Sequence, residues 1–505
     1  MTDVVANDLA EVEDGAGRRG EVDRRRFIRM GVLGSAFASA ALMQQSPSAA
    51  RALLQNSIRF GVPTMDDLVA AGPELALPAG FSYVTFGAFG SAMTDGFITP
   101  PLHDGMGVFE GVDPGTYRIV RNHEIGEGND IGPNPPIGYP SFAYDRRGPG
   151  GCTTMTVDED GNMLESFVSI NGTDTNCAGA PTPWNTWLTC EETTTGVRAR
   201  HEKPHGYVFE VDAHADRIRR YKPIKEMGRM LHEAGAVDPD SSVVYLTEDE
   251  GPDGFYRFIP KTPGALSDGG RLQILRIKGE DGYNTVLGQT VGDVLPATWV
   301  DIDDVDPADA EDNPSAIFRE GRMKGAARFL GGEGCTFRSN GDGVPGSVVF
   351  DSSDGGDAGL GQIWEYTPTT KHGKREEEGE LVLLFESSGR KTLDGPDNLC
   401  TSPGGAIVIA EDGAARANFL RVLLPDGSIF PFAENLLAVQ IALVDQMGKV
   451  YDPNVPFDDF DFGDGFGYSE MAGPRFSPDG KWLFANIQVP GITVAITGDW
   501  ASLGM

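Results

Sequence analysis

The stretch Thr186-Trp-Leu-Thr-Cys-Glu-Glu192 is a short apolar strand that contains a cysteine and runs directly into two acidic side chains. Five other stretches share this design, an apolar strand that ends in acidic or amide residues: Tyr117–Glu124, Val243–Glu250, Val348–Asp354, Ala406–Asp412 and Trp482–Gln488. One such strand carries little information. Six of them predict a ring of similar units, each of which offers oxygen ligands at a common end. Such a ring would surround a metal-centred active site.

The spacing of the polar strand ends indicates how the units are built. Most steps suit four strands with a long loop, and one longer step leaves room for an insertion around residues 261–346. Asp-Gly turns separate alternating apolar runs, and helical periodicity is confined to residues 66–71 and 434–447. We therefore expect residues 51–505 to form one all-β domain, a six-bladed β-propeller with long inter-strand loops. Because the repeats are divergent, a β-sandwich or several small β domains is the alternative.

The N-terminus has the features of an export signal. The run Asp23-Arg-Arg-Arg-Phe-Ile-Arg29 precedes an apolar stretch from Met30 to Met43, and small residues follow at 48–50. This order is that of a twin-arginine signal, and the alternative is a chance basic patch before a short helix. We expect residues 1–50 to be the signal and the protein to be periplasmic or extracellular. Transit through the twin-arginine export machinery, which moves folded proteins, favours metal insertion before export.

The charge of the chain narrows its partners. With 75 acidic and 41 basic residues, the formal net charge is −34, which disfavours nucleic acid and anionic membranes as partners. Outside the signal, no segment is long and apolar enough to span a bilayer, so we expect no stable membrane anchor. We also expect a monomer. The excess of carboxylates is explained either by solubility or by a cation site.

Cysteine and histidine usage limits the metal chemistry. The cysteines are Cys152, Cys177, Cys190, Cys335 and Cys400. They include no Cys-x-x-Cys pair, which excludes a zinc ribbon, and disulfides remain open for an exported protein. His201 and His205 form the one close histidine pair, and their Pro-broken, polar context predicts a loop rather than a helical zinc site.

A ring of carboxylates has a direct chemical consequence. Carboxylates that face one another across a channel repel at close range unless cations lie between them. Calcium takes about six to eight oxygen ligands, which a ring of Asp, Glu and Asn can supply. A thiolate binds softer metals such as iron or zinc better. A cysteine among the acidic strand ends therefore indicates a mixed site.

A series of stretches stands out along the chain: Arg121–Glu124, Asn176–Gly179, Thr182–Trp184, Thr186–Glu192, Gly228–Ala234, Tyr245–Glu250, Gly361–Tyr366, Pro396–Leu399, Phe476–Gly480 and Asn486–Gly491. As a set and in this order, they resemble the PhoX-type alkaline phosphatase family. The likeness covers nearly all of the chain beyond the signal. It implies an exported phosphomonoesterase on a six-bladed propeller that depends on calcium and iron.

The resemblance also implies site residues. It implies a channel cluster of Fe³⁺ and Ca²⁺ ions with an oxo bridge, in which Cys190 is the thiolate ligand of iron. The implied carboxylate ligands are Glu124, Glu191, Glu233, Asp249, Asp397, Glu411 and Asp412. Asn176 and Asn398 would orient the phosphate or bind calcium. The alternatives are that Cys190 is a small buried hydrophobe and that His123 and His232 are core histidines.

One position departs from the family pattern. Family members tend to carry an arginine two residues before a glutamate, where a guanidinium can hold phosphate with two hydrogen bonds. Here Glu333 fits, but Gly331 occupies the arginine position. We expect Glu333 and Asn176 to take part in catalysis, and either Arg328 reaches the site from nearby or the metals alone hold the phosphate.

These implications give an expected function. The protein would hydrolyse a small-molecule phosphate ester, as an alkaline phosphomonoesterase whose nucleophile is a metal-bound oxo or hydroxide group in the channel. Two alternatives stay open. One is a calcium-dependent phosphodiesterase or lactonase on the same ring, and the other is a non-catalytic propeller that calcium stabilises.

Overall fold

The structure is a computed structural model that describes residues 63–126, 137–199, 201–341, 344–369, 378–413, 417–440 and 466–505. The chain divides into two units, residues 1–55 and residues 56–505. The first unit contains the expected twin-arginine signal, which lies outside the described residues. All that follows concerns the second unit.

Antiparallel sheets make up nearly all of the described chain. Two sheets near the N-terminus are β4 (His103–Glu110), β5 (Thr116–His123), β6 (Gly150–Asp158) and β7 (Met163–Thr173), then β8 (Asn176–Pro181), β9 (Thr186–Glu191) and β10 (Val208–Asp212). A nine-stranded sheet follows in the order β11 (His232–Val237), β12 (Val244–Glu248), β13 (Tyr256–Pro260), β14 (Gly270–Ile277), β15 (Val294–Asp301), β19 (Gly379–Glu386), β18 (Gln362–Pro368), β17 (Ser347–Ser352) and β16 (Cys335–Arg338).

The remaining sheets lie toward the C-terminus, and two of them also contain strands from the start of the second unit. They are β20 (Pro396–Thr401), β21 (Ile407–Glu411), β22 (Phe419–Leu423), β23 (Ile429–Asn435), β2 (Leu75–Pro78) and β1 (Leu68–Ala70); β26 (Met471–Phe476), β27 (Leu483–Ile487), β28 (Ile492–Thr497) and β3 (Ser82–Phe86); and the pair β24 (Ala438–Gln440) and β25 (Phe466–Tyr468). Among the described residues the only α-helix is α4 (Ala316–Met323). The fold is therefore all-β.

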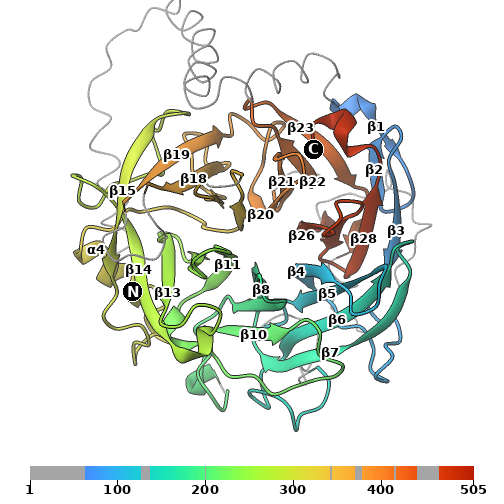
Figure 1. The fold of residues 1–505 in the computed structure, drawn as a ribbon, viewed down its shortest axis with the longest axis horizontal. Helices are drawn as coiled ribbons and strands as arrows, with labels where there is room; N and C mark the ends of the chain where they lie inside the picture. The colour runs from blue at the N-terminus through green and yellow to red at the C-terminus, as the bar shows by residue number, and fades with distance from the viewer. Residues whose placement is uncertain are drawn as a thin grey trace, which may run out of the picture. The chain divides into compact units, whose positions relative to one another are not determined.

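The sheets are arranged round a common centre, as in a propeller (Figure 1). Apart from the pair β24–β25, each sheet contributes one innermost strand, and the nine-stranded sheet contributes one from each end: β4, β8, β11, β16, β20 and β26. Each contacts the next in this order, and β26 contacts β4, so the inner strands form a closed ring. Close approach demands small residues, and a Cβ added to Gly105 of β4 would lie 2.5 Å from the Cα of Ala178 in β8.

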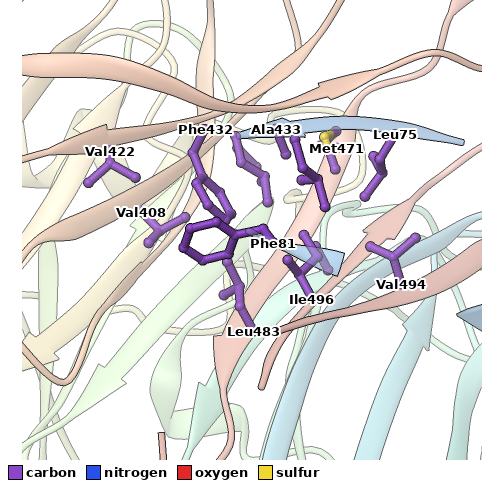
Figure 2. Packing of buried hydrophobic residues seen from close by; sticks show 14 of the residues in the cluster. Leu75, Phe81, Val408, Val422, Phe432, Ala433, Met471, Leu483, Val494 and Ile496 are labelled. Carbon is purple, nitrogen blue, oxygen red and sulfur yellow. The ribbon is translucent and has the colours of Figure 1, made fainter. Parts of the chain in front are cut away.

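The ring closes where the two ends of the second unit meet. Strand β2 pairs with β23, and β3 pairs with β28, so early strands complete late sheets. Between these sheets lies a hydrophobic cluster in which Phe81 stacks edge-on against Phe432 at 5.1 Å and Trp500 at 5.0 Å (Figure 2). Each such aromatic pair adds about 0.5–1.5 kcal/mol beyond its area burial. Hydrogen bonds and apolar packing therefore close the ring together.

The structure corrects two local expectations and refines a third. The expected helix at 66–71 is a 3-10 turn, Met65–Asp67, followed by strand β1 (Leu68–Ala70). The described part of the expected helix at 434–447 is strand and loop, because β23 ends at Asn435 and β24 begins at Ala438. The expected insertion around 261–346 contains β14, β15 and α4, but it also contains the inner strand β16. No helix in the described ranges is long and apolar enough to cross a membrane.

Candidate metal centre

Ligand-type side chains recur at one equivalent position in the inner strands. In four inner strands, the residue after the first paired residue lies where the pairing with the neighbouring strand shifts its register. These residues are Asp104, Cys177, Glu233 and Asp397. Such a bulge adds a residue and re-aims a side chain. Glu333 precedes β16 by two residues, and the Gly334 amide beside it donates to the Asp397 carbonyl at 3.1 Å. Five inner strands thus present a ligand at their N-terminal ends.

A second set of polar residues follows the ends of the neighbouring strands. Each comes directly after the last residue of β5, β9, β12, β17, β21 or β27: Glu124, Glu192, Asp249, Ser353, Asp412 and Gln488. Because these strands run antiparallel to the inner strands, their C-terminal ends meet the inner strands' N-terminal ends. Gln488 Nε2 donates to Glu124 Oε2 at 2.5 Å, and Ser353 Oγ donates to Glu333 Oε1 at 3.0 Å.

Side chains from both sets form three overlapping groups. The groups are Asp104, Glu124 and Cys177; Cys177, Glu192 and Glu233; and Glu233, Glu333 and Asp397. Within each group, one potential ligand atom of every residue lies within 4.8 Å of the others. Cys177 and Glu233 each belong to two groups. Because the groups share these residues, the three groups together form a row of potential ligands. Neighbouring cations in this row would share ligands.

The electrostatics of this row call for cations. Burial raises the pKa of Glu233 well above its usual value, and the charge of Glu333 raises it further. The pKa values of Glu124, Glu192, Glu333 and Asp397 are raised in the same way, first by burial and then by a neighbouring carboxyl. Both carboxyl oxygens of Glu233 are buried without a hydrogen-bond partner among the described residues. An unpaired buried carboxylate is costly, so this donor set fits metal ions.

Further carboxyls surround the row. Asp249 raises the pKa values of Glu192 and Glu333, and Asp412 raises that of Asp397. Glu470, directly before β26, is half-buried, and its pKa is raised well above its usual value by desolvation and then by Asp412. The main charges that raise these pKa values are those of other carboxyls, and no described lysine or arginine is among the main charges that act on them.

The structure thus brings together several of the residues expected from the sequence. Glu124, Glu233, Glu333 and Asp397 lie in the three groups. Asp249 and Asp412 lie at their border, close enough to act on them electrostatically. Asn398, next to Asp397, donates to its neighbour's carboxylate at 2.7 Å and accepts from the Gly473 amide at 2.6 Å.

Glu191 and Glu411 do not lie in these groups. Alternation along a strand sends adjacent side chains to opposite sides, so Glu191 points away from the side that Glu192 faces. Glu191 accepts hydrogen bonds from the Gly206 amide at 2.9 Å and from the His205 ring at 2.6 Å. Glu411 accepts from Arg421 Nε at 2.8 Å. Both carboxylates accept hydrogen bonds next to their own sheets, whereas the following residues, Glu192 and Asp412, lie in or beside the groups.

Cys190 also lies elsewhere. Its side chain is fully buried in an apolar cluster with Leu188 and Val208, on the face of its sheet rather than at the inner edge. The thiol that lies with the carboxylates is that of Cys177, whose Sγ is 3.5 Å from Asp104 Oδ2. The sequence predicted one sulfur among the acidic side chains. In the structure, the sulfur that lies there is that of Cys177.

The other two expected catalytic residues are likewise outside the groups. The Asn176 side chain accepts from Thr173 Oγ1 at 2.5 Å and donates to Thr189 Oγ1 at 2.9 Å, because Asn176 and Cys177 point to opposite sides of β8. The Arg328 backbone pairs with residues 283 and 285, and no described contact joins its guanidinium to the carboxylates.

Sequence reasoning did not name Asp104, Cys177, Glu192 and Glu470, which lie in or beside the three groups. A usable signal exists, because an acidic residue or cysteine precedes a small residue at four of the five inner-strand starts, Asp104-Gly105, Cys177-Ala178, Glu233-Ala234 and Glu333-Gly334, whereas Asp397 precedes Asn398. These small residues line a narrow cavity at the centre of the ring. The repeat is therefore a ligand followed by a residue that allows close strand packing.

The glycine that replaces the family's arginine has a local explanation. Gly331 has a φ of +67°, and an added Cβ would lie 2.2 Å from Ser353 Oγ. We predict that Gly331→Arg lowers the free energy of unfolding by about 1–3 kcal/mol or more, which chemical denaturation measures. Gly80→Arg is the matched control, since Gly80 also has a positive φ but open space around it. Equal losses in the two variants would contradict the clash.

Comparison with known proteins identifies the family of the chain. A family model described as alkaline phosphatase PhoX matches residues 65–165 and 162–491, nearly all of the second unit. Among solved structures, the chain is similar to PhoX from Pseudomonas fluorescens in complex with vanadate, a transition state analogue. The TM-score is 0.59 at 16% identity, over 88% of this chain and 98% of that chain. At this identity the likeness concerns the fold.

Two further structures are much less similar. They are a gluconolactonase from Xanthomonas campestris and the PQQ domain of a pyranose dehydrogenase from Coprinopsis cinerea. Their TM-scores are 0.35 and 0.32, at 11% and 10% identity, over 85% and 86% of this chain and 98% of each of theirs, and we draw nothing from them. A comparison with curated protein sequences gives no match. The match of the family model over both ranges shows that the chain belongs to the PhoX alkaline phosphatase family and is a phosphatase.

Proposed function

We propose that the chain is a metal-dependent phosphoric monoester hydrolase whose cations are held by the three overlapping ligand groups. The observation that carries the proposal is the convergence of a thiol and several carboxyls from different sheets, with Glu233 left unpaired at their centre. Family membership supplies the phosphatase activity. The ligand set supplies the reason for metal dependence.

The chemistry of the donors suggests which ions bind where. The groups that contain Cys177 combine a thiolate with carboxylates, which suits iron. The group of Glu233, Glu333 and Asp397 offers oxygens alone, which suits calcium. Burial and Asp104 raise the pKa of the Cys177 thiol, so the thiol would release its proton to solvent only when a metal ion binds the sulfur. We therefore propose Fe³⁺ near Cys177 and Ca²⁺ beyond Glu233.

The chain's own residues then have distinct tasks. Bound cations would neutralise the phosphoryl oxygens and lower the pKa of a water molecule to give the nucleophile. Glu233 and Cys177, each shared by two groups, would fix the spacing between neighbouring ions. Gln488 orients Glu124, and Ser353 orients Glu333, each through one hydrogen bond. Since no basic side chain of the described residues is a main electrostatic neighbour of the row, the phosphate would be held mainly by the metals.

Some finer features belong to the same proposal. We interpret the six inner strands as six blades, two of which join at their outer edges through the pairing of β15 with β19 to give the nine-stranded sheet. We also propose export through the twin-arginine pathway, a monomeric state and a small-molecule phosphate ester as substrate. These proposals are consistent with the expected N-terminal signal sequence and with the charge of the chain.

Metal removal tests the proposal. We predict that a chelator abolishes hydrolysis of a chromogenic phosphomonoester and that iron with calcium restores it. The cations should stabilise the fold by about 2.7 kcal/mol when present at about 100 times their dissociation constants. Retention of full turnover after iron and calcium have been removed, verified by elemental analysis, would contradict metal dependence. Activity on a phosphodiester alone would contradict monoester specificity.

The metal-free protein should also respond to pH. Its ring carboxyls have pKa values raised above the usual 4.5 of glutamate, so the folded state binds more protons than the unfolded state. The stability that this contributes is present below about pH 4.5 and is lost as the pH rises through the raised values. Chelated protein should therefore melt at a lower temperature at about pH 8 than at about pH 6, and excess Ca²⁺ should reduce the difference.

A further inference from the structure

A second cluster of potential ligands lies in the loops near the row. Asp145 belongs to the loop between β5 and β6, and His201 and His205 belong to the loop between β9 and β10. One ligand atom of each lies within 4.8 Å of the others, and all three residues are buried. His205 Nε2 is 3.7 Å from Asp145 Oδ2, and the two imidazole centroids are 4.3 Å apart.

Each histidine is oriented by a buried carboxylate on its far side. His201 Nε2 is 2.8 Å from Asp174 Oδ2, and His205 Nδ1 is 2.6 Å from Glu191 Oε1. Ionised carboxylates only accept hydrogen bonds, so these two ring nitrogens donate. A histidine that donates one N–H to a carboxylate and turns its other nitrogen to a metal is the usual arrangement at zinc sites.

The other two ring nitrogens make no hydrogen bond within the described residues, and His205 Nε2 has a longer contact with Asp145 Oδ2 at 3.7 Å. Neither His201 Nδ1 nor His205 Nε2 has a hydrogen-bond partner within the described part of the chain, although both are fully buried. In a neutral imidazole whose opposite nitrogen carries the proton, this nitrogen holds a lone pair. A buried lone pair without a donor is costly, and here two of them lie beside one carboxylate.

We propose that Asp145, His201 and His205 bind a single Zn²⁺ ion, separate from the cations of the phosphatase centre. Zinc accepts two imidazole nitrogens and a carboxylate oxygen at about 2.0–2.2 Å, with a water as fourth ligand. The 3.7 Å between His205 Nε2 and Asp145 Oδ2 is close to the spacing of two ligands on one tetrahedral ion. Calcium and magnesium prefer all-oxygen sites, so the imidazoles select a transition metal.

The site has a structural consequence. It would tie the β5–β6 loop to the β9–β10 loop, and through Asp174 and Glu191 it also reaches the β7–β8 loop and the end of β9. Glu191 directly precedes Glu192, a member of the phosphatase row. The zinc would thus anchor the backbone from which one side of that row projects.

The rival interpretation is a protonated histidine. Burial opposes the charge on His205, but Glu191 and Asp145 favour it and raise the pKa of His205 to about 10 when no metal is present. An imidazolium held between two carboxylates would then take the place of the ion. The two interpretations differ in whether the protein takes up zinc at this cluster.

Zinc uptake by the full chain tests the proposal. Purified protein with its iron and calcium in place receives Zn²⁺, is desalted, and is analysed for zinc content and melting temperature. We expect wild type to retain about one zinc per chain that Asp145→Asn and His205→Gln lose. His214→Gln, a half-buried histidine outside the cluster, and Cys177→Ser, within the phosphatase row, should keep it. Equal zinc in wild type and both cluster variants would overturn the proposal.

A second measurement covers the case in which the variants do not fold. X-ray absorption at the zinc edge on zinc-loaded wild type should reveal two imidazoles and oxygen, without sulfur. A sulfur ligand would assign the zinc to Cys177 and refute the second site. Absence of any retained zinc, together with nitrogen NMR signals of a doubly protonated His205 ring, would establish the imidazolium instead. Because the phosphatase assay is not used, failure here is distinct from failure of the proposed function.

Discussion

Replacing Cys177 with serine is expected to remove the iron and to lower phosphomonoester turnover by at least about 100-fold. Cys177 is the one thiol among the three ligand groups and belongs to two of them. A serine hydroxyl keeps its proton near neutral pH and is a poor ligand for iron, so both groups lose their soft donor. Elemental analysis and kcat on the same preparation measure the effect.

The matched control is Cys190→Ser. Cys190 is equally buried but lies in an apolar cluster, so its serine variant should keep the iron and lose only stability, by about 1–3 kcal/mol for an unsatisfied hydroxyl. Loss of iron from Cys190→Ser together with retention of iron in Cys177→Ser would refute the assignment of the thiol ligand.

Two adjacent glutamates give the second large effect. Glu192→Gln removes one ligand charge from the middle group and should lower metal occupancy and turnover, about 10- to 100-fold. The metal-free variant should be more stable than metal-free wild type, because burial and Asp249 already raise the pKa of Glu192. Glutamine relieves that repulsion without changing the size of the side chain.

Glu191→Gln should behave in the opposite way. The Glu191 carboxylate accepts hydrogen bonds from the backbone amides of Gly206 and Tyr207. In glutamine an NH2 group replaces one carboxylate oxygen, so a donor would face the N–H groups from which that oxygen accepts. The metal-free protein should therefore lose about 1–3 kcal/mol in chemical denaturation. If Glu191→Gln lost the iron and Glu192→Gln retained it, the sequence expectation for Glu191 would be right and the geometry wrong.

Adjacent acidic residues mark the limit of the sequence analysis. Strand ends rich in carboxylates predicted Glu124, Asp249 and Asp412, and the structure places Glu124 in one of the three groups and the other two beside them. At Glu191-Glu192 the two residues are chemically alike, and only the register of β9 decides which one faces the centre. Register depends on pairing with β8, which the sequence of β9 alone does not contain.

The inner strands escaped notice for a related reason. Strand β8 reads Asn176-Cys-Ala-Gly-Ala-Pro181, without a β-branched or aromatic residue, and β4 contains two glycines. Such composition is depleted in strands and resembles loop. Here crowding at the centre of the ring selects small residues, and Gly105 would clash with Ala178 if it carried a side chain. Tertiary packing thus overrides strand propensity at the residues that carry the ligands.

The histidine pair shows a correct local prediction with a missing partner. Residues 201 and 205 lie in a loop, as their Pro-broken context predicts. Asp145, Asp174 and Glu191 reach them from distant parts of the chain. No local pattern links these five positions, so the cluster could be recognised only in the folded structure.

The most direct test of the phosphatase centre is an anomalous-scattering map of crystals of the natively exported protein, measured at the iron absorption edge. We predict a peak within bonding distance of Cys177 Sγ, bordered by Glu192 and Glu233, in protein that hydrolyses a phosphomonoester. Iron beside Cys190, or full turnover in crystals and solutions without iron at the row, would contradict the account.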